Sequence, residues 1–371
     1  MSEQGIIEMK GTKYGAFLAL VRLGIGHNAG YLPPISDWST IETQAEQQGL
    51  SAILVDGVEK IQKDKRPPQE ILLQWIGTVL QEYKYRFDSY RKAIAGLAGW
   101  YIQHGYKMMV LKGYSCSLDW PKPEHRPCGD IDIWLFGKQK EADALLKNEK
   151  GIEIEEDQHH HTIFSWQDFV VENHYDFVNV HAHRSSRELE KIFKELGQDD
   201  SHYVEMTDAS TGSAAKVYLP SPNFHALFLI RHAASHFAAE GINLRQVLDW
   251  AFFVEKHTKE INWPWLISLL EKYHMKDFYN CINAICVEDL GFSVNIFAGV
   301  QFAPSLKEKI LNDILMPEYE HEPPRSLITR LIFKWKRWRD SAWKRELCYN
   351  EGGLSSLITG LWAHILKPST I

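Results

Sequence analysis

The sequence predicts an α+β protein in which a group of strands lies between two helical regions. Between residues 72 and 101, apolar side chains recur at the i, i+3, i+4 and i+7 positions of an amphipathic helix. After residue 101 the pattern changes to short apolar runs in which polar residues alternate. Pro220, Ser221 and Pro222 interrupt the chain, and helical patterns return after them. We therefore expect a helical region over residues 1–100, a strand-containing domain over 101–220 and a second helical region over 221–371.

The long helix of the first region has recognisable ends. Pro67 and Pro68 precede it, and proline suits the first turn of a helix. The pattern continues past Tyr83 towards Trp100, and Gly105 ends it shortly before a strand that begins near Lys107. We expect this helix to pack against the strands.

Composition predicts an intracellular globular protein. The 371 residues are 44% hydrophobic and 24% charged, which suits about two or three domains with their own cores. A net charge of −7 gives no general electrostatic attraction to nucleic acid. The five cysteines are odd in number and show no C-x-x-C spacing. The apolar run 16–21 is too short for a signal sequence or a membrane span, so we expect a cytoplasmic protein without stable membrane insertion.

The first predicted strand, residues 108–111, is followed by Lys112 and Gly113. Glycine lets the backbone approach a phosphate closely. A lysine at this place can supply positive charge to the same group. The loop that follows ends with Arg126, a second cation.

The segment 129–134, with the sequence GDIDIW, carries the chemistry of the predicted site. Side chains alternate along a strand, so Asp130 and Asp132 point the same way. Two carboxylates on one face repel each other, and a hard divalent ion such as Mg²⁺ relieves that repulsion. Solvated carboxylates at a strand edge are the alternative interpretation of this pair.

A further predicted strand, residues 169–177, follows a turn at Gln167 and Asp168. Its alternation places Glu172, His174 and Asp176 on one face. If this strand lies beside residues 130–132, three carboxylates come together, which is enough to hold two metal ions.

At these motifs the chain resembles the nucleotidyltransferase superfamily, and within it a group of uncharacterised bacterial nucleotidyltransferases. The resemblance spans about residues 90–255. Its motifs are Leu111-Lys112-Gly113, Arg126 with Gly129-Asp130-Ile131-Asp132, Val171-Glu172-Asn173-His174, and residues 227–250 with His232, His236, Arg245 and Asp249.

The resemblance implies a nucleotidyltransferase-like mixed sheet in residues 101–220 and transfer of an NMP group from an NTP to a hydroxyl. The implied cofactor is Mg²⁺ or Mn²⁺. Asp130 and Asp132 would bind the metals, with Asp132 bridging them, and Glu172 would complete the site, although Asp176 remains an alternative. The implied nucleotide-binding residues are Lys112, Gly113, Ser115 and Arg126.

The chain departs from the superfamily pattern around its phosphate-binding turn. The usual Gly-Gly or Gly-Ser pair is absent, because Tyr114 separates Gly113 from Ser115. A long loop then precedes Asp130 in place of a short gap. Both features leave the role of Ser115 open. Arg126 has an alternative to nucleotide binding, which is a structural ion pair with a nearby Asp.

The second helical region adds candidates for the lining of the cleft. His232 and His236 stand at i and i+4 and so share a helix face, a spacing that also binds zinc, but no third ligand is near in sequence. A buried histidine pair is the alternative. Arg245 is either directed into the cleft with His174 or paired with Asp249 on its own helix.

Two other features receive no site assignment. Three successive histidines, 159–161, stand at the start of a predicted strand over residues 161–166. They cannot share one face of a strand, so at most His159 and His161 act together, and we assign no metal there. The segment 333–345 mixes tryptophan with Lys and Arg. It is either an amphipathic packed helix or a contact for phospholipid or RNA.

Two alternatives to the enzyme hypothesis remain. A catalytically weak nucleotide-binding or regulatory protein would have lost the third carboxylate from the site. A toxin-like enzyme that modifies RNA or protein would arrest growth in an Asp130-dependent way. The acceptor is a small molecule, a sugar, a protein or an RNA, and the sequence identifies neither it nor the base of the NTP.

Overall fold

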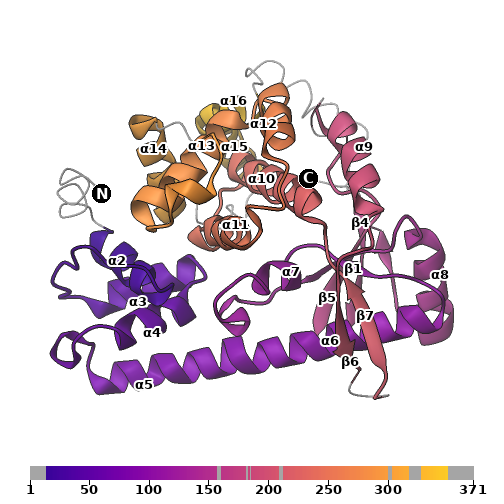
Figure 1. Ribbon diagram of the computed structural model, residues 1–371, viewed down its shortest axis with the longest axis horizontal. Coiled ribbons are helices and arrows are strands. Elements are labelled where there is room, and N and C mark those ends of the chain that lie inside the picture. The colour runs from indigo at the N-terminus through magenta and orange to yellow at the C-terminus, as the bar shows by residue number, and fades with distance from the viewer. Residues whose placement is uncertain are drawn as a thin grey trace. The chain divides into compact units, whose positions relative to one another are not determined.

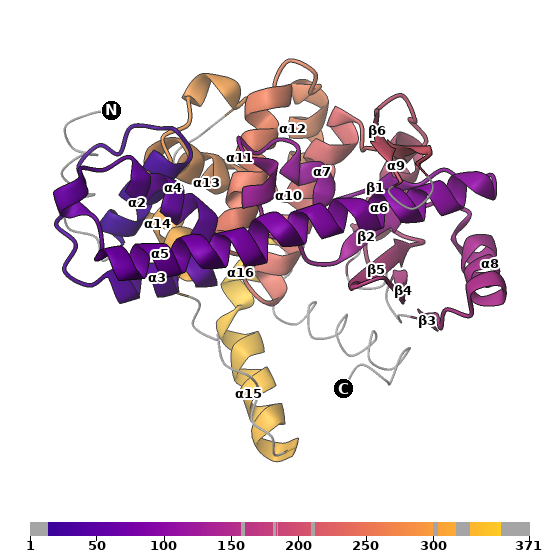
Figure 2. The same ribbon diagram turned by 90° about the horizontal axis from the view of Figure 1, so that it is seen from below.

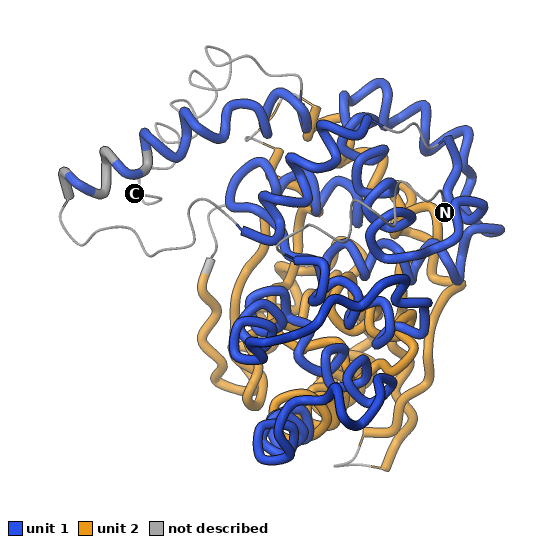
Figure 3. The backbone as a smooth tube through the Cα atoms, turned by 90° about the vertical axis from the view of Figure 1, so that its left-hand side faces the viewer, with its two compact units in different colours: residues 1–80, 229–356 blue, residues 81–228, 357–371 orange. Residues whose placement is uncertain are grey.

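The computed structural model describes residues 14–156, 160–180, 183, 185–208, 212–299, 303–316 and 327–349. The chain divides into two compact units (Figure 3). One is formed by residues 1–80 and 229–356 and the other by residues 81–228 and 357–371, as far as the described residues within these ranges show. The division into three regions along the sequence stays a prediction.

The unit that contains residues 81–228 is built on a mixed seven-stranded sheet (Figure 1). Strands β2 and β5 are parallel, as are β1 and β7, and the other neighbouring strands are antiparallel. Their order is β3-β4-β5-β2-β1-β7-β6. The strands are β1 (Met109–Val110), β2 (Ile131–Trp134), β3 (Glu155–Glu156), β4 (His161–Trp166), β5 (Phe169–His174), β6 (Tyr203–Thr207) and β7 (Ala214–Tyr218). This mixed sheet among helices confirms the α+β prediction.

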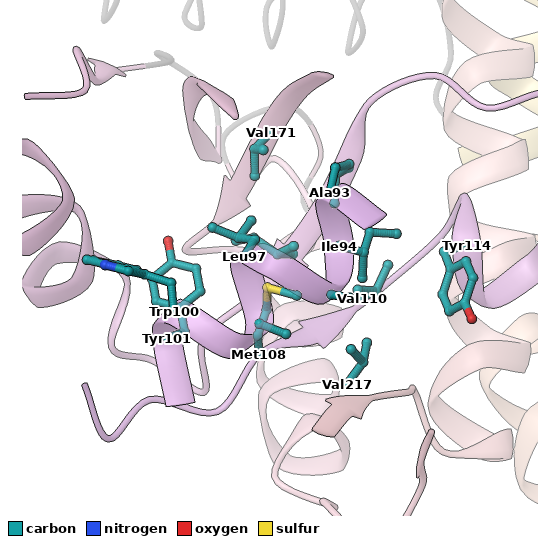
Figure 4. Packing of buried hydrophobic residues seen from close by; sticks show 14 of the residues in the cluster. Ala93, Ile94, Leu97, Trp100, Tyr101, Met108, Val110, Tyr114, Val171 and Val217 are labelled. Carbon is teal, nitrogen blue, oxygen red and sulfur yellow. The ribbon is translucent and has the colours of Figure 1, made fainter. Parts of the chain in front are cut away.

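Helix α6 (Arg86–Gln103) covers one face of the sheet. Ile94 and Leu97 of the helix lie in one buried cluster with Val110, Val171 and Val217 of three strands (Figure 4). Figure 2 shows α6 beside β2, β5 and β4 from a second direction. Helix α8 (Gln139–Lys150) adds apolar side chains to the same cluster. This face is therefore the hydrophobic core, and Asp132, Glu172 and His174 of the strands lie on the other.

The predicted long helix is confirmed, but the side chains of its apolar stripe are only partly buried. The helical stretch consists of α5 (Gln69–Thr78), a π-helical segment (Val79–Tyr85) and α6. Leu73 and Leu80 are 58% and 43% exposed, whereas Trp75 and Val79 are buried. A π-helical segment has more residues per turn than an α-helix, so it changes which side chains before and after it lie on the same side of the helix.

Aromatic rings cover part of the opposite face of the sheet. Trp134 of β2 contacts Phe177, and Phe193 and Phe224 pack around that ring at centroid distances of 6.0 and 4.9 Å. Phe193 lies on α9 (Ser186–Gly197), and Phe224 lies at the start of α10 (Pro222–Ala239). A Cβ at Gly197 would lie 3.0 Å from the Trp134 ring, so a larger residue there would require the ring or α9 to shift.

The other unit consists of helices and short helical turns in its described residues. Before the sheet in sequence come α2 (Gly15–Gly24), α3 (Trp38–Gln47), α4 (Ser51–Glu59) and α5, and after it α11 (Leu244–His257), α12 (Trp263–Lys272), α13 (Lys276–Ala284), α14 (Pro304–Leu315), α15 (Leu327–Asp340) and α16 (Ala342–Tyr349). Trp335 of α15 is 57% exposed. All five cysteines are free thiols. None of the described helices has both the length and the apolar character needed to cross a bilayer.

A buried polar network joins α8 to the sheet. The carboxylate of Asp143 accepts hydrogen bonds from Asn173 Nδ2 at 2.8 Å, from Thr162 Oγ1 at 2.7 Å and from the Gln139 amide. Asn173 is fully buried in β5 and Thr162 lies beside it in β4. The network therefore orients α8 on the two strands.

We predict that Asp143→Ala destabilises the protein by about 1–3 kcal/mol, because it leaves buried donors without an acceptor. The urea midpoint of unfolding measures the loss. Glu141→Ala on the exposed side of the same helix removes only a surface ion pair with Lys138 and serves as the control, with a change within about 0.5 kcal/mol. Equal midpoints for the two variants would contradict this role of Asp143.

The helical unit contains a buried ion cluster around Lys307. Its ammonium lies 3.0 Å from carboxylate oxygens of Asp289 and Glu288 and 2.8 Å from Glu308. Burial raises the pKa of Asp289 from 3.8 to about 6, although Lys307 acts in the opposite direction. A carboxyl group with a higher pKa in the folded than in the unfolded chain takes up a proton on folding.

We predict that the stabilising contribution of Asp289 is complete below pH 3.8 and is lost as the pH rises to about 6. Asp289→Asn should flatten the dependence of the melting temperature on pH in this interval. Asp64→Asn at an exposed position of the same unit should leave the dependence as in the wild type. Identical pH profiles for Asp289→Asn and the wild type would contradict the prediction.

Candidate active site

The register between β2 and β5 brings the acidic side chains of the candidate site together. Asp132 pairs with Glu172, and Trp134 pairs with His174. Paired residues of neighbouring strands point to the same face. Asp132, Glu172 and His174 consequently lie on the face opposite α6, with potential ligand atoms all within 4.8 Å of one another.

Asp132 is a buried carboxylate that contacts Lys112 and His174. Its Oδ1 lies 3.0 Å from Lys112 Nζ and 3.1 Å from His174 Nε2, and the residue is 1% exposed. Burial alone would raise its pKa, but Lys112 and His174 hold the pKa well below its ordinary value. The second oxygen, Oδ2, has no hydrogen-bond partner among the described residues. A buried anionic oxygen without a donor is costly, and a bound cation would remove that cost.

Lys112 is tied to the same carboxylates. Burial would lower the pKa of Lys112, but Asp132, Asp130 and Glu172 outweigh it and raise the pKa. The ammonium is therefore charged. Lys112 follows β1 in the sequence after one residue, which is where the motif predicted a cation.

Glu172 lacks the compensation that Asp132 receives. Burial, followed by the charge of Asp132, raises the pKa of Glu172 to about 8, although Lys112 acts in the opposite direction. The site therefore has too little positive charge to ionise all of its carboxylates near neutral pH. A divalent cation bound here would supply that charge.

Asp130 and Gly113 are held in place by one tyrosine. Asp130 precedes β2, and its carbonyl oxygen accepts a 2.8 Å hydrogen bond from Tyr90 Oη of α6. The charge of Asp130 contributes to the raised pKa values of Lys112 and Glu172. Its carboxylate does not belong to the group formed by Asp132, Glu172 and His174, whose ligand atoms lie within 4.8 Å of one another. Gly113 has a φ of +67°, and a Cβ there would lie 2.6 Å from Tyr90 Oη. Glycine is thus required at this turn.

Ser115 and Arg126 are buried in the structure. The hydroxyl of Ser115, in the short helix α7 (Tyr114–Ser117), donates to the carbonyl of Leu111. Arg126 donates from Nη1 to the carbonyl of Pro127 at 3.2 Å. Burial raises the pKa of Tyr90 well above its ordinary value, and the charge of Arg126 acts in the opposite direction.

The two acidic residues between which the sequence did not decide have different surroundings. Glu172 lies in register with Asp132, whereas Asp176 follows the end of β5 and pairs with Lys194 of α9 at 2.6 Å.

The structure also brings two further histidines to the site. His161 is the first residue of β4 and pairs with His174, and its ring lies 5.2 Å from that of His174 between centroids. The ring of His160 lies 5.3 Å from that of His174. The expectation that at most His159 and His161 act together is therefore wrong, since His160 also lies near His174. Strand β4 begins at His161, so the alternation of side chains along a strand does not apply to His160. His159 lies outside the described residues.

A comparison with protein families matches residues 34–291, more than half of the chain, to the family described as uncharacterised nucleotidyltransferase. The chain belongs to this family. This result confirms the resemblance that the motifs predicted. A comparison with curated proteins finds no match. Among solved structures, an antigenic nucleotidyltransferase-like protein from Paracoccidioides brasiliensis matches at 15% identity and a TM-score of 0.30, over 45% of this chain and 76% of the other. A likeness at that TM-score carries no argument here.

The remaining candidate residues, His232, His236 and Arg245, lie in the helical unit. His232 and His236 of α10 face each other with ring centroids 4.3 Å apart. Neither belongs to a group of three potential metal ligands among the described residues. Arg245 lies at the start of α11. Their place in the lining of a cleft stays a prediction.

We predict that Gly113→Ala lowers stability by about 1–2 kcal/mol, because the new methyl group meets Tyr90 Oη and the left-handed backbone disfavours a side chain. Tyr90→Phe in the same chain should restore part of the loss by removing the hydroxyl. The melting temperature reports both effects. Gly129→Ala is the matched control, since a Cβ there has no neighbour within 4 Å. Equal melting temperatures for the two alanine variants would contradict the prediction.

Proposed function

We propose that this protein transfers an NMP group from an NTP to a hydroxyl acceptor in a reaction that depends on divalent metal ions. One observation carries the proposal. The buried Asp132 has one carboxylate oxygen without a hydrogen-bond partner among the described residues. Beside it lies the carboxylate of Glu172, whose pKa is raised to about 8 by burial and by the charge of Asp132.

The donor atoms suit hard divalent ions. Carboxylate oxygens are the ligands that Mg²⁺ and Mn²⁺ prefer. In this proposal Asp130 and Asp132 hold the ions, with Asp132 between them, and Glu172 completes the site on the acceptor side. Ions bound there stabilise the attacking and leaving oxygens of an in-line displacement at the α-phosphorus.

The cations of the site bind the triphosphate in this proposal. Lys112 lies at the carboxylates and offsets phosphate charge, as lysine does in other phosphate sites. Gly113 keeps the backbone open to a phosphate oxygen, and Arg126 supplies a second positive charge. We limit the part of Ser115 to its backbone N–H, because its hydroxyl donates to Leu111.

The arrangement of Glu172 bears on the alternative function. A catalytically weak relative would have lost the third carboxylate from the site, whereas Glu172 lies in register with Asp132. This supports an active enzyme over a nucleotide-binding or regulatory protein. The acceptor, whether a small molecule, a sugar, a protein or an RNA, is not part of the proposal, and growth arrest that depends on Asp130 would identify a toxin-like enzyme.

We predict that one of the four NTPs binds in the presence of Mg²⁺, and that Asp130→Asn/Asp132→Asn weakens this binding by about a hundredfold or more because the metal ligands are lost. Isothermal titration of each NTP, with and without Mg²⁺, measures the effect without knowledge of the acceptor. Asp168→Asn, at an exposed turn of the same unit, should bind as the wild type does. Metal-dependent binding that is equal in the double variant and in the wild type would overturn the site assignment. Binding of no NTP would overturn the function.

A further inference from the structure

A group of three histidines adjoins the carboxylates. His160 and His161 come from the start of β4, and His174 comes from the end of β5. One nitrogen of each ring lies within 4.8 Å of the corresponding nitrogens of the other two. Zinc–nitrogen bonds are about 2.0–2.1 Å long, so tetrahedral ligands of one ion lie about 3.4 Å apart, and small ring rotations would bring nitrogens within 4.8 Å to that spacing.

The backbone holds these histidines firmly in place. His161 and His174 are register partners in the antiparallel pair of β4 and β5, and they are 9% and 2% exposed. The carbonyl of His160 accepts hydrogen bonds from the N–H groups of Tyr175 and Asp176, both at 3.0 Å. The backbone that carries the three rings is therefore ordered before any ligand binds, which lowers the cost of bringing the rings to one ion.

The hydrogen bonds of His174 determine which of its nitrogens can bind a metal. Its Nδ1 lies 3.2 Å from the carbonyl oxygen of Asp176. A carbonyl only accepts, so Nδ1 carries the hydrogen. Nε2 of the neutral ring then has a lone pair, yet it lies 3.1 Å from Asp132 Oδ1 and 3.8 Å from Glu172 Oε2. Nε2 is therefore the nitrogen of His174 that is available to a metal ion.

This arrangement is the one found around metal-binding histidines. Such a ring donates its remote N–H to a backbone carbonyl or a carboxylate and presents its other nitrogen to the metal. Imidazole ligands favour Zn²⁺ and other first-row transition ions, whereas Mg²⁺ prefers oxygen.

We propose that His160, His161 and His174 bind a first-row transition metal ion of the Zn²⁺ type, at a position distinct from that of the Mg²⁺ ions. Three histidine ligands leave a fourth position of a tetrahedral ion open, as in catalytic zinc sites. His174 offers a single lone pair and therefore serves this ion, which leaves Asp130, Asp132 and Glu172 for the ions that accompany the nucleotide. The inference goes beyond the proposed transfer reaction, since histidine ligation needs no nucleotide.

Cobalt(II) tests this site in the full-length, metal-free protein. Co²⁺ replaces Zn²⁺ at nitrogen sites and gives visible d–d absorption, which Mg²⁺ cannot give. We expect one equivalent of Co²⁺ to produce this absorption in the presence of excess Mg²⁺ and Zn²⁺ to abolish it. His160→Ala, at a partly buried position, and His161→Gln, which keeps a side chain in the strand, should each weaken Co²⁺ binding by about tenfold or more.

Two further variants make the result specific. His202→Ala removes a largely exposed histidine of the same unit and should bind Co²⁺ as the wild type does. Asp132→Asn should retain the Co²⁺ absorption while it loses Mg²⁺-dependent NTP binding. Absence of the absorption, wild-type Co²⁺ affinity in His160→Ala and His161→Gln, or loss of Co²⁺ binding in Asp132→Asn would each overturn the site. Absorption without NTP binding would overturn the proposed function alone, and NTP binding without absorption would overturn this inference alone.

Discussion

The parallel pairing of β2 with β5 is the constraint on which the candidate site depends. Side chains alternate along both strands, so Ile131 and Val171 pack in the core under α6 while Asp132 and Glu172 face the other way. A slip of one residue would place a carboxylate in that core and an apolar side chain at the site. The free energy of apolar burial therefore enforces the register that brings the two carboxylates together.

That register produces an imbalance of charge. Lys112 and His174 compensate Asp132, but Glu172 receives too little positive charge and its pKa is raised. The electrostatic free energy of such a site is unfavourable, and a bound cation lowers it. The carboxylates offer oxygen ligands to the ions proposed to accompany the nucleotide, and the three histidines offer nitrogen ligands to the separate ion.

Particular residues show how far the sequence pattern extends. The strand predicted over residues 161–166 is β4, and alternation placed Glu172 and His174 on one face as the structure has them. The turn at Gln167 and Asp168 joins β4 to β5, so counting back from it leads to the pairing of His161 with His174. This signal for the histidine group was present in the sequence. His160 had none, because its ring position depends on how the chain enters the strand.

The sequence by itself determined local features of this protein, namely the α+β class, the strands β1, β2, β4 and β5 and the ends of the long helix. Each follows from spacing within a few residues, which the geometry of one helix or strand dictates. Only the tertiary structure decided that β5 lies beside β2, that Tyr90 of α6 holds the Asp130 carbonyl, and that Leu73 and Leu80 are exposed. These features join residues far apart in the chain, and their energy comes from packing around a common core, which no local spacing encodes.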